Sequence, residues 1–278
     1  MSSVVWNNTK TVLLLGGLSG LLVAVGGAMG QQFIIPFLGL AVLMNLGAWF
    51  FSDKMAIAAM QGREVTAQTG GDLYRMVDEL RQRANLPMPR VYICPHEAPN
   101  AFATGRSPSK AAVAVTQGAL QLLSREELEG VMAHELAHVK NRDTLISTIA
   151  ATISGVLAMV AQWGLFLGGG NREGANPLVM IVTVIFAALG AALLKAMISR
   201  SREFVADAEG AAIAGSPHGL INALRKLEAY SKRIPLQHNN PAYNNLFIIE
   251  PFSGSKAMEL FATHPPTEKR VAALMRLA

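Results

Sequence analysis

The sequence predicts an α+β membrane protein that is mostly helical, with up to four transmembrane helices and a small β-sheet beside a helix that carries two histidines. Three observations support this fold class. The 278 residues are 51% hydrophobic and only 15% charged, and the hydrophobic residues are gathered in blocks. Two histidines lie four residues apart in a run without glycine or proline, which favours a helix. Short stretches rich in β-branched residues precede that run.

Four hydrophobic segments are long enough to cross a membrane, because a hydrocarbon core about 30 Å thick needs roughly 20 apolar helical residues. Residues 11–30 and 33–51 contain no charged side chain and are separated by a short polar link, which predicts a helical hairpin. A cleavable signal peptide is the alternative for the first segment, but a second span follows at once and no A-x-A motif stands out. Residues 144–170 and 177–194 predict a second hairpin, which could instead line a cavity or lie against the rest of the chain.

These hairpins divide the chain into four parts and give it an orientation. The parts are residues 1–54, 55–143, 144–198 and 199–278. Lysine and arginine flank the spans on the side that carries both termini, whereas the opposite loops contain only Arg172. By the positive-inside rule, both termini and the histidine helix are cytoplasmic. The basic residues on that side are Lys10, Lys54, Arg63, Lys140, Arg142, Arg200 and Arg202.

Charge, cysteine and glycine usage indicate the surroundings of the chain. The net charge of +5 suits anionic lipid headgroups, and no basic or aromatic module for nucleic acid is present. Cys94 is the only cysteine, so it cannot form an internal disulfide and suits a reducing compartment. Small residues four apart, Gly16 with Gly20 and Gly26 with Gly30, favour close helix packing and are compatible with a homo-oligomer.

The stretch Val-Met-Ala-His-Glu-Leu-Ala-His over residues 131–138 carries a metal-binding pattern. Positions four apart share one helical face, so His134 and His138 can direct both imidazoles at one zinc ion. Glu135 is turned by about 100° from His134, which places its carboxylate beside a water on the metal, where it can act as general base. The alternative is a helix on which both histidines merely occupy a polar face.

A second helix supplies the candidate third ligand. A catalytic zinc commonly has three protein ligands and one open position. Glu203 and Asp207 lie four residues apart in a segment that is predicted to be helical over residues 199–214. We assign Glu203 as the third ligand and Asp207 as the acceptor for the free N–H of a ligand histidine. Taken alone, this pair would read as a solvated helix face near arginines.

The histidine helix has a clear predicted start. Ser124 and Glu127 form a capping-box pattern, so the helix is expected to begin near Arg125 and to run through Asn141. No strongly helix-breaking residue follows Asn141. The helix is therefore expected to lead directly into the hydrophobic run that begins at Thr144, which would anchor the metal site to a membrane helix.

Three short strands are predicted before this helix, the last two as a hairpin, over residues 90–94, 100–105 and 112–116. Their edge could accept a peptide in extended form, or the strands could only cover the histidine helix. Residues 72–85 form an amphipathic pattern that predicts a helix. A connector with a helical tendency is expected over residues 55–63.

The carboxyl-terminal part is predicted to contain two helices around a loop. One helix runs from Pro217 to about Tyr230, a loop over residues 234–254 covers a substrate cleft, and the last helix opens at Thr263. Three histidines have no partner spacing and are expected at the surface: His96, His218 and His238.

Five landmarks along the chain form one pattern. They are the amino-terminal hydrophobic hairpin and residues 99–105 (PNAFATG), 134–138 (HELAH), 201–207 (SREFVAD) and 263–266 (THPP). This pattern resembles the HtpX family of bacterial inner-membrane zinc metalloproteases, distant relatives of the eukaryotic CAAX prenyl endopeptidases. The resemblance covers essentially the whole chain. It implies a zincin-like protease domain on the cytoplasmic side of the membrane.

The resemblance also implies a role for each candidate residue of the metal site. One zinc ion per chain would be bound by His134, His138 and Glu203. Glu135 would be the catalytic acid and base, and Asp207 would orient a ligand.

Three further residues are assigned through the resemblance alone. It implies that His264 stabilises the transition state, that Arg270 supports His264, and that Asn100 contacts the substrate backbone. The substrates it implies are misfolded or damaged membrane proteins, cleaved at the cytoplasmic face of the bacterial inner membrane, often under envelope stress. The expected partners are therefore membrane-protein or peptide substrates and the lipid bilayer.

Two alternative functions stay open at this point. A CAAX-type processing protease would use the same chemistry on a narrow substrate, although four possible spans are few for enclosing a large intramembrane chamber. A membrane scaffold with a structural zinc would need four protein ligands, and the sequence offers three good ones.

Overall fold

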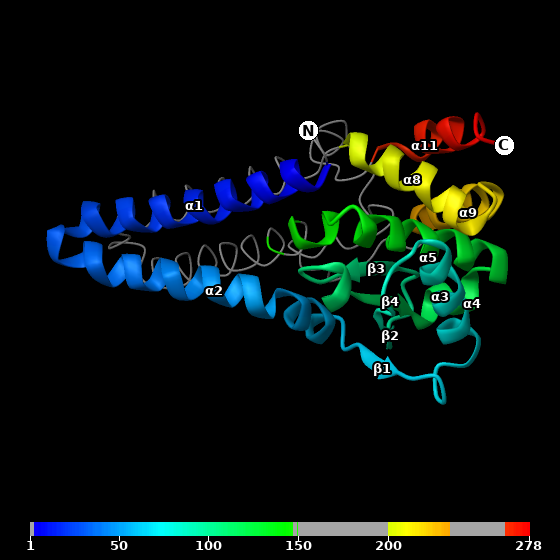
Figure 1. The fold of residues 1–278 in the computed structure, drawn as a ribbon, viewed down its shortest axis with the longest axis horizontal. Coiled ribbons are helices and arrows are strands. Elements are labelled where there is room, and N and C mark those ends of the chain that lie inside the picture. The colour runs from blue at the N-terminus through cyan, green and yellow to red at the C-terminus, as the bar shows by residue number, and fades with distance from the viewer. Residues whose placement is uncertain (1–2, 147–148, 150–199, 234–264) are drawn as a thin grey trace.

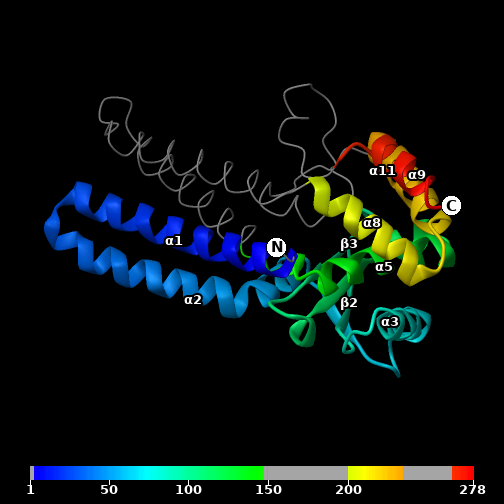
Figure 2. The ribbon, with the colours of Figure 1, turned by 45° about the horizontal axis from the view of Figure 1, so that its top comes forward.

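The computed structural model describes residues 3–146, 149, 200–233 and 265–278. Within these residues, a long helical hairpin projects from a body in which helices cover a small sheet (Figure 1). The hairpin consists of α1 (Ser3–Met29) and α2 (Ile34–Ala59), joined by the short 3-10 helix η1 (Gln31–Phe33). The two long helices lie side by side in both ribbon views (Figures 1 and 2). The predicted class, mostly helical with a small sheet, is confirmed.

The first predicted pair of apolar helices is present as this hairpin. Gln31–Phe51 is long and apolar enough to cross a membrane, and Thr11–Ala24 on α1 is a shorter apolar stretch. Among the described residues, Gln31–Phe51 alone meets that test of length and composition. The second predicted pair, residues 144–198, lies almost entirely outside the described residues. The number of four spans therefore stays a prediction.

Polar contacts and one glycine fix the geometry of the hairpin. The side-chain amide of Asn45 donates hydrogen bonds to the carbonyl of Leu15 (3.1 Å) and to the hydroxyl of Ser19 (2.8 Å). Such bonds join apolar helices where no water competes for the polar groups. At the tip, Gly30 has φ 134°, which L side chains rarely adopt, so glycine suits this turn.

The sheet has four strands in the order β1-β2-β4-β3. β2 and β4 are parallel, while β1 pairs with β2 and β3 pairs with β4 in antiparallel fashion. Three strands and the β3–β4 hairpin confirm the prediction. The connector predicted over residues 55–63 is wrong in part, because α2 continues to Ala59 and Arg63 begins a strand. The strands are β1 (Arg63–Val65), β2 (Arg90–Cys94), β3 (Ala101–Thr104) and β4 (Ala112–Thr116).

Both faces of the sheet are buried, and they face different parts of the molecule. Side chains alternate along each strand, so neighbours in sequence point to opposite faces. Val91 and Val113 belong to the main core, together with residues of α5. Tyr92 and Phe102 instead pack with the last turns of α2. The sheet therefore lies between the end of the hairpin and the helix that carries the two histidines.

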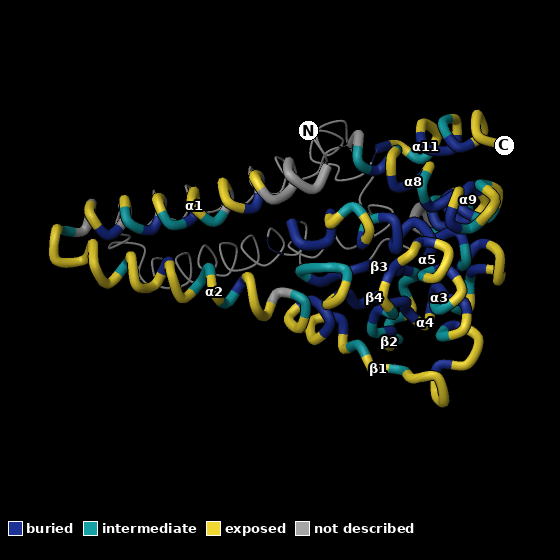
Figure 3. The backbone as a smooth tube through the Cα atoms, in the orientation of Figure 1, coloured by how far each residue is buried: buried dark blue, intermediate teal, exposed yellow. Residues whose placement is uncertain are grey.

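Six further helices and one 3-10 helix complete the described elements. Figure 3 shows that buried residues concentrate in this body, while exposed ones follow the hairpin. The amphipathic helix predicted over residues 72–85 is present as α3, with its apolar side buried. The elements are α3 (Gly71–Arg83), η2 (Pro108–Lys110), α4 (Gln117–Leu122), α5 (Arg125–Lys140), α8 (Arg200–Ala214), α9 (His218–Arg233) and α11 (Thr267–Leu274).

Helix α5 is the centre of the body. Its capping box is confirmed, because the Ser124 hydroxyl accepts from the Glu127 N–H and the Glu127 carboxylate accepts from the Ser124 N–H. α5 packs against the sheet on one side and against α8 and α9 on the other (Figures 1 and 2). At the α9 contact, a Cβ added to Gly130 would collide with the backbone of Leu220, so glycine permits the close approach.

The end of α5 corrects one expectation. The helix does not lead directly into the next hydrophobic run, because Asn141 and Arg142 form a turn and helical structure resumes at Asp143. Arg142 has φ 56°, in the left-handed region that non-glycine residues seldom occupy. The chain therefore changes direction between the histidine helix and the residues that follow.

Candidate metal centre and active site

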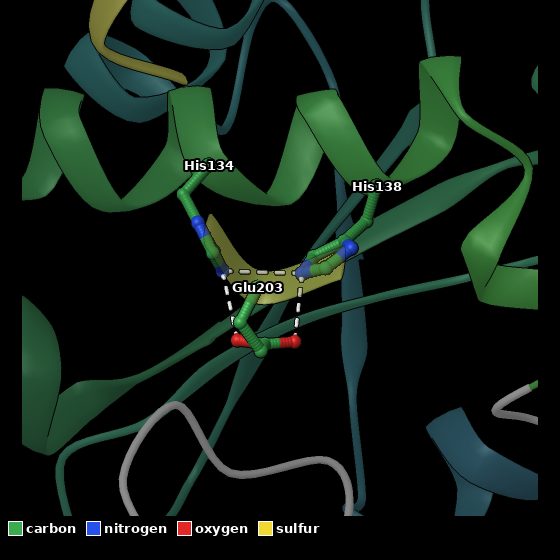
Figure 4. A group of neighbouring side chains, drawn as sticks. All are labelled: His134, His138 and Glu203. Carbon is green, nitrogen blue, oxygen red and sulfur yellow. Dashed lines mark hydrogen bonds and ion pairs between the residues drawn. The ribbon is translucent and has the colours of Figure 1, made fainter. Parts of the chain in front are cut away.

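Three predicted ligands converge on one point (Figure 4). His134 and His138 project from α5, and Glu203 reaches them from α8. The two Nε2 atoms are 3.1 Å apart, and the Glu203 carboxylate oxygens lie 3.7 Å from His134 Nε2 and 3.5 Å from His138 Nε2. Zinc–ligand distances of about 2.0–2.1 Å in a tetrahedron require ligand atoms roughly 3.3 Å apart. The triangle therefore fits a tetrahedral zinc ion.

The donor set also leaves room for a further ligand. Of the residues that the structure describes, the group of metal-ligating side chains contains these three alone. Two imidazoles and one carboxylate form the donor set of catalytic rather than structural zinc sites. This favours an enzyme over the scaffold alternative.

Gly210 allows α8 to approach α5 closely enough for Glu203 to reach the histidines. Residues 203, 207 and 210 share one face of α8, because they are spaced four and three residues apart. A Cβ added at Gly210 would lie 2.9 Å from both the N and the Cα atoms of His134. Any larger residue would have to move one helix away from the other.

Glu135 lies beside the ligand group and contacts the sheet. Its Oε2 accepts a hydrogen bond of 2.8 Å from the backbone N–H of Ala103 on β3. Glu135 is buried, and it does not belong to the group of ligand atoms. This is the placement that the helical rotation predicted, next to the metal position rather than on it.

Asp207 and Arg270 form a buried pair behind His134. The Asp207 Oδ1 lies 3.0 Å from His134 Nδ1, although the geometry is not that of a linear hydrogen bond. Arg270 on α11 donates from Nε and Nη2 to the two Asp207 oxygens, at 2.9 and 2.6 Å. Burial alone would raise the pKa of Asp207, but the Arg270 guanidinium outweighs it and holds the pKa at about 2.

Arg270 also contacts the ligands themselves. Its Nη1 lies 3.7 Å from the Glu203 carboxylate, and its Nη2 lies 3.4 Å from His134 Nε2. The side chain is 1% exposed. A buried guanidinium persists only where carboxylates surround it, so α11 is held against the ligand helix by charge.

Asp143 is a contact of the site that the sequence analysis missed. Its Oδ2 lies 3.1 Å from His138 Nδ1, and its Oδ1 lies 3.5 Å from Arg202 Nη1. Burial lowers the pKa of His138. The Asp143 hydrogen bond and the charges of Glu203 and Glu135 outweigh that effect and raise the pKa to about 9.

The remaining predicted residues have mixed outcomes. Asn100 is buried directly before β3, and its backbone N–H donates to the Thr116 hydroxyl at 2.8 Å. His264 and His238 lie outside the described residues. His218 is exposed as expected, whereas His96 is only half-exposed and its ring Nε2 lies 3.1 Å from the Met60 carbonyl.

Comparison with known proteins agrees with this geometry. The sequence profile described as Peptidase family M48 matches residues 67–278. Proteins named Protease HtpX homolog from Nostoc punctiforme and Syntrophotalea carbinolica are 50% and 51% identical. These alignments cover 98% and 96% of this chain, and 96% and 98% of the relatives. The homolog from Pyrococcus furiosus is 47% identical over 97% of this chain and 95% of its own.

A solved structure with low sequence identity has a similar fold. The crystal structure of Ste24p from S. mikatae matches with a TM-score of 0.52 at 17% identity, covering 97% of this chain. This chain spans 66% of the length of that protein. Since the family profile covers most of the chain and the named proteases align over nearly all of it, the chain belongs to peptidase family M48 and is a membrane metalloprotease of the HtpX family.

Proposed function

We propose that this protein is a zinc endopeptidase that hydrolyses peptide bonds of misfolded or damaged membrane proteins at the cytoplasmic face of the bacterial inner membrane. The observation that carries the proposal is the ligand triangle of His134, His138 and Glu203 with the Glu135 carboxylate beside it. In this arrangement Glu203 completes the metal site, and Glu135 stays off the metal and can transfer a proton.

The metal would be held by His134, His138 and Glu203. A bound zinc ion supplies Lewis acidity, which polarises the scissile carbonyl and lowers the pKa of a water ligand. Asp207 orients His134 through its Nδ1 atom, and Arg270 holds Asp207 in place.

Glu135 acts as the general base and then as the general acid. Its carboxylate takes a proton from the attacking water and passes that proton to the leaving amine. The hydrogen bond from Ala103 N–H fixes the carboxylate between the metal ligands and the edge strand. One oxygen is thereby tied to the sheet, which leaves the other for the proton.

The outer edge of β3, the last strand of the described sheet, is the surface on which we place the substrate backbone. The Thr116 N–H bonds to the Asn100 carbonyl, and hydrogen-bonded pairs alternate along an antiparallel ladder. The backbone groups of Ala101 and Ala103 therefore face away from β4. The Ala103 N–H is bonded to Glu135, so on our proposal a peptide in extended form would pair with the backbone groups of Ala101 and the carbonyl of Ala103, with Asn100 at one end as a further contact.

His264 is proposed as the donor that stabilises the oxyanion. Its supporting observation is the position of Arg270, because that residue fixes the start of α11 beside Glu203 and Asp207. His264 precedes the first residue of α11 by three positions. We propose that its imidazole donates to the developing charge, as the family resemblance implies.

Membrane substrates are supported by the way the hairpin meets the body. The last turns of α2 pack on the sheet, and Arg90 Nη2 lies 3.0 Å from the Asp53 carboxylate at the same junction. The apolar stretch Gln31–Phe51 ends just before that ion pair. The edge strand is therefore held near the end of the membrane-spanning stretch.

The test is cleavage of an unfolded membrane protein by the purified, zinc-loaded enzyme in detergent. Glu135→Gln should bind zinc normally and lose cleavage by about 10²-fold or more, because the general base is gone. Glu126→Gln, on the exposed first turn of α5, is the matched control and should keep full activity.

Two results would count against the proposal. Full proteolysis by Glu135→Gln, with contaminating protease excluded, would remove Glu135 from the mechanism. Cleavage of a prenylated peptide together with no cleavage of the unfolded protein would replace the quality-control substrate by a CAAX-type one.

A further inference from the structure

Each candidate metal-binding histidine has its own carboxylate behind it. His134 Nδ1 lies 3.0 Å from Asp207, and His138 Nδ1 lies 3.1 Å from Asp143. Both carboxylates are buried. An arginine also contacts each carboxylate. Arg270 donates to both oxygens of Asp207, including the Oδ1 beside the ring, and Arg202 lies 3.5 Å from the Asp143 oxygen that does not contact His138.

The backbone explains how Asp143 comes to lie beside His138. In a continuous helix, a residue five positions further on is rotated by roughly 140° and would face away from the imidazole. α5 instead ends at Lys140, and Arg142 adopts φ 56° before helical structure resumes at Asp143. A non-glycine residue held in this region is uncommon and is often found where a precise placement is needed.

Arg202 ties this placement to the second ligand helix. It lies on α8 directly before Glu203, and its guanidinium faces the Asp143 oxygen that does not contact His138. The side chains of Arg202 and Asp143 are mostly buried, at 15% and 6% exposure. The contact therefore joins the segment after α5 to the start of α8.

We propose that Asp143, held by Arg202, is a positioning residue for His138. Its carboxylate accepts a hydrogen bond from the Nδ1–H of His138, which selects the tautomer whose Nε2 lone pair faces the metal position. This inference rests on the proposed zinc site. Asp143 also directly precedes Thr144, where the next hydrophobic run begins, so the same residue joins the metal ligand to the chain that leads there.

Zinc affinity of the purified full-length protein tests this role. Removing a carboxylate that orients a ligand histidine weakens metal binding by roughly 10–100-fold. Asp143→Ala should show that loss in a competition titration with a chromophoric chelator. Asp143→Asn keeps an oxygen acceptor and should recover most of the affinity. Asp78→Ala, which removes a carboxylate that pairs with Arg81 on α3, is the control and should bind as the wild type does.

A spectroscopic readout separates positioning from folding. The visible absorption of the cobalt-substituted protein reports ligand geometry and should change in Asp143→Ala but not in Asp78→Ala. Thermal unfolding of each metal-free variant shows whether the chain still folds. If Asp143→Ala does not fold, Arg202→Met takes its place and should weaken zinc binding several-fold while Arg202→Lys restores it.

The outcomes distinguish this inference from the proposed function. If the wild type binds no zinc, the metal site itself is wrong. If the wild type binds zinc and a folded Asp143→Ala binds it equally well with an unchanged cobalt spectrum, the metal site stands and the role of Asp143 is refuted. If the Arg202 variants are used instead, equal zinc affinity in Arg202→Met and the wild type likewise refutes the positioning role of Asp143.

Discussion

The hairpin and the body of this protein use apolar and polar residues in opposite ways. Large apolar side chains on α2 point outward, with Ile35 79% and Leu43 69% exposed, whereas those of α5 point into the core. In the body, the fully buried positions include a charged one, Arg270. A long stretch of large exposed apolar residues suits lipid surroundings, and a charge is buried only where it is paired with opposite charges.

The comparison shows where stability and chemistry reside. The hairpin exposes mainly apolar side chains, and polar contacts such as those of Asn45 lie between its helices. The body concentrates its buried charges around the metal ligands. Changes to these buried charges should therefore destabilise the body, whereas charges introduced into the hairpin should affect the association with the membrane.

Removal of Arg270 should have the largest effect, because it leaves Asp207 buried without the guanidinium that binds both of its oxygens. Breaking a buried ion pair by removing one partner costs about 3–5 kcal/mol. We expect Arg270→Ala to lower the free energy of unfolding in detergent by that amount. Arg75→Ala, which removes an exposed arginine paired with Asp72, should show no measurable change. Equal stability of the two variants would contradict the comparison.

A charge in the hairpin should act on the membrane and not on the body. Leu43 is exposed near the middle of the stretch Gln31–Phe51. An arginine at the centre of a spanning helix costs about 2.5–3.5 kcal/mol on insertion scales. We expect Leu43→Arg to reduce the fraction that resists carbonate extraction from membranes. The midpoint of thermal unfolding of the body in detergent should not change, and a large fall there would show that the hairpin also stabilises the body.

Gly210 tests the spacing between the ligand helices. Gly210→Ala places a methyl group against the backbone of His134, so α8 must move away from α5. Overpacking of this kind costs about 1–3 kcal/mol, and zinc affinity should fall because Glu203 moves with α8. Gly47→Ala on α2, where a Cβ meets nothing within 4 Å, is the control and should bind zinc normally. Chelator competition measures both, and unchanged binding by Gly210→Ala would show that the spacing is not critical.

The smallest expected effect is the release of a proton from His138 when zinc binds. The pKa of His138 is raised from 6.5 to about 9, so the metal-free folded protein holds a proton that the unfolded chain loses above pH 6.5. The stabilisation from this group is complete below pH 6.5 and is lost as the pH rises through 9. Zinc requires the neutral imidazole, so binding at about pH 7.5 should release this proton. Calorimetry in buffers of different ionisation enthalpy measures the release, and its absence would contradict the raised pKa.

Helical periodicity explains why much of the site could be predicted. His134, His138 and Glu135 lie on one short run, and Glu203 and Asp207 repeat the same spacing on a second helix. The convergence of these two helices could not be read from spacing. It depends on Gly210, which looks like an ordinary helix glycine until the backbone of His134 is seen beside it.

Asp143 and β1 show what local patterns leave out. The sequence predicts that the histidine helix leads directly into the next hydrophobic run, and in a helix continued in this way Asp143 would face away from His138. The turn at Arg142 is made by a residue with no intrinsic preference for positive φ, so no sequence signal marked it. β1 has three residues and depends on its pairing with β2, which lies well beyond it in the sequence.

Neighbouring residues of β3 contact two different parts of the molecule, the end of the hairpin and the candidate metal site. Phe102 belongs to the cluster formed with the end of α2, and Ala103 holds the carboxylate of Glu135. On the proposed function, this strand would set the distance of the Glu135 carboxylate from the end of the apolar stretch Gln31–Phe51. A polypeptide leaving the bilayer would then be cut where its backbone first reaches that distance, so the cleavage point would be measured out in residues from the membrane rather than selected by side-chain identity.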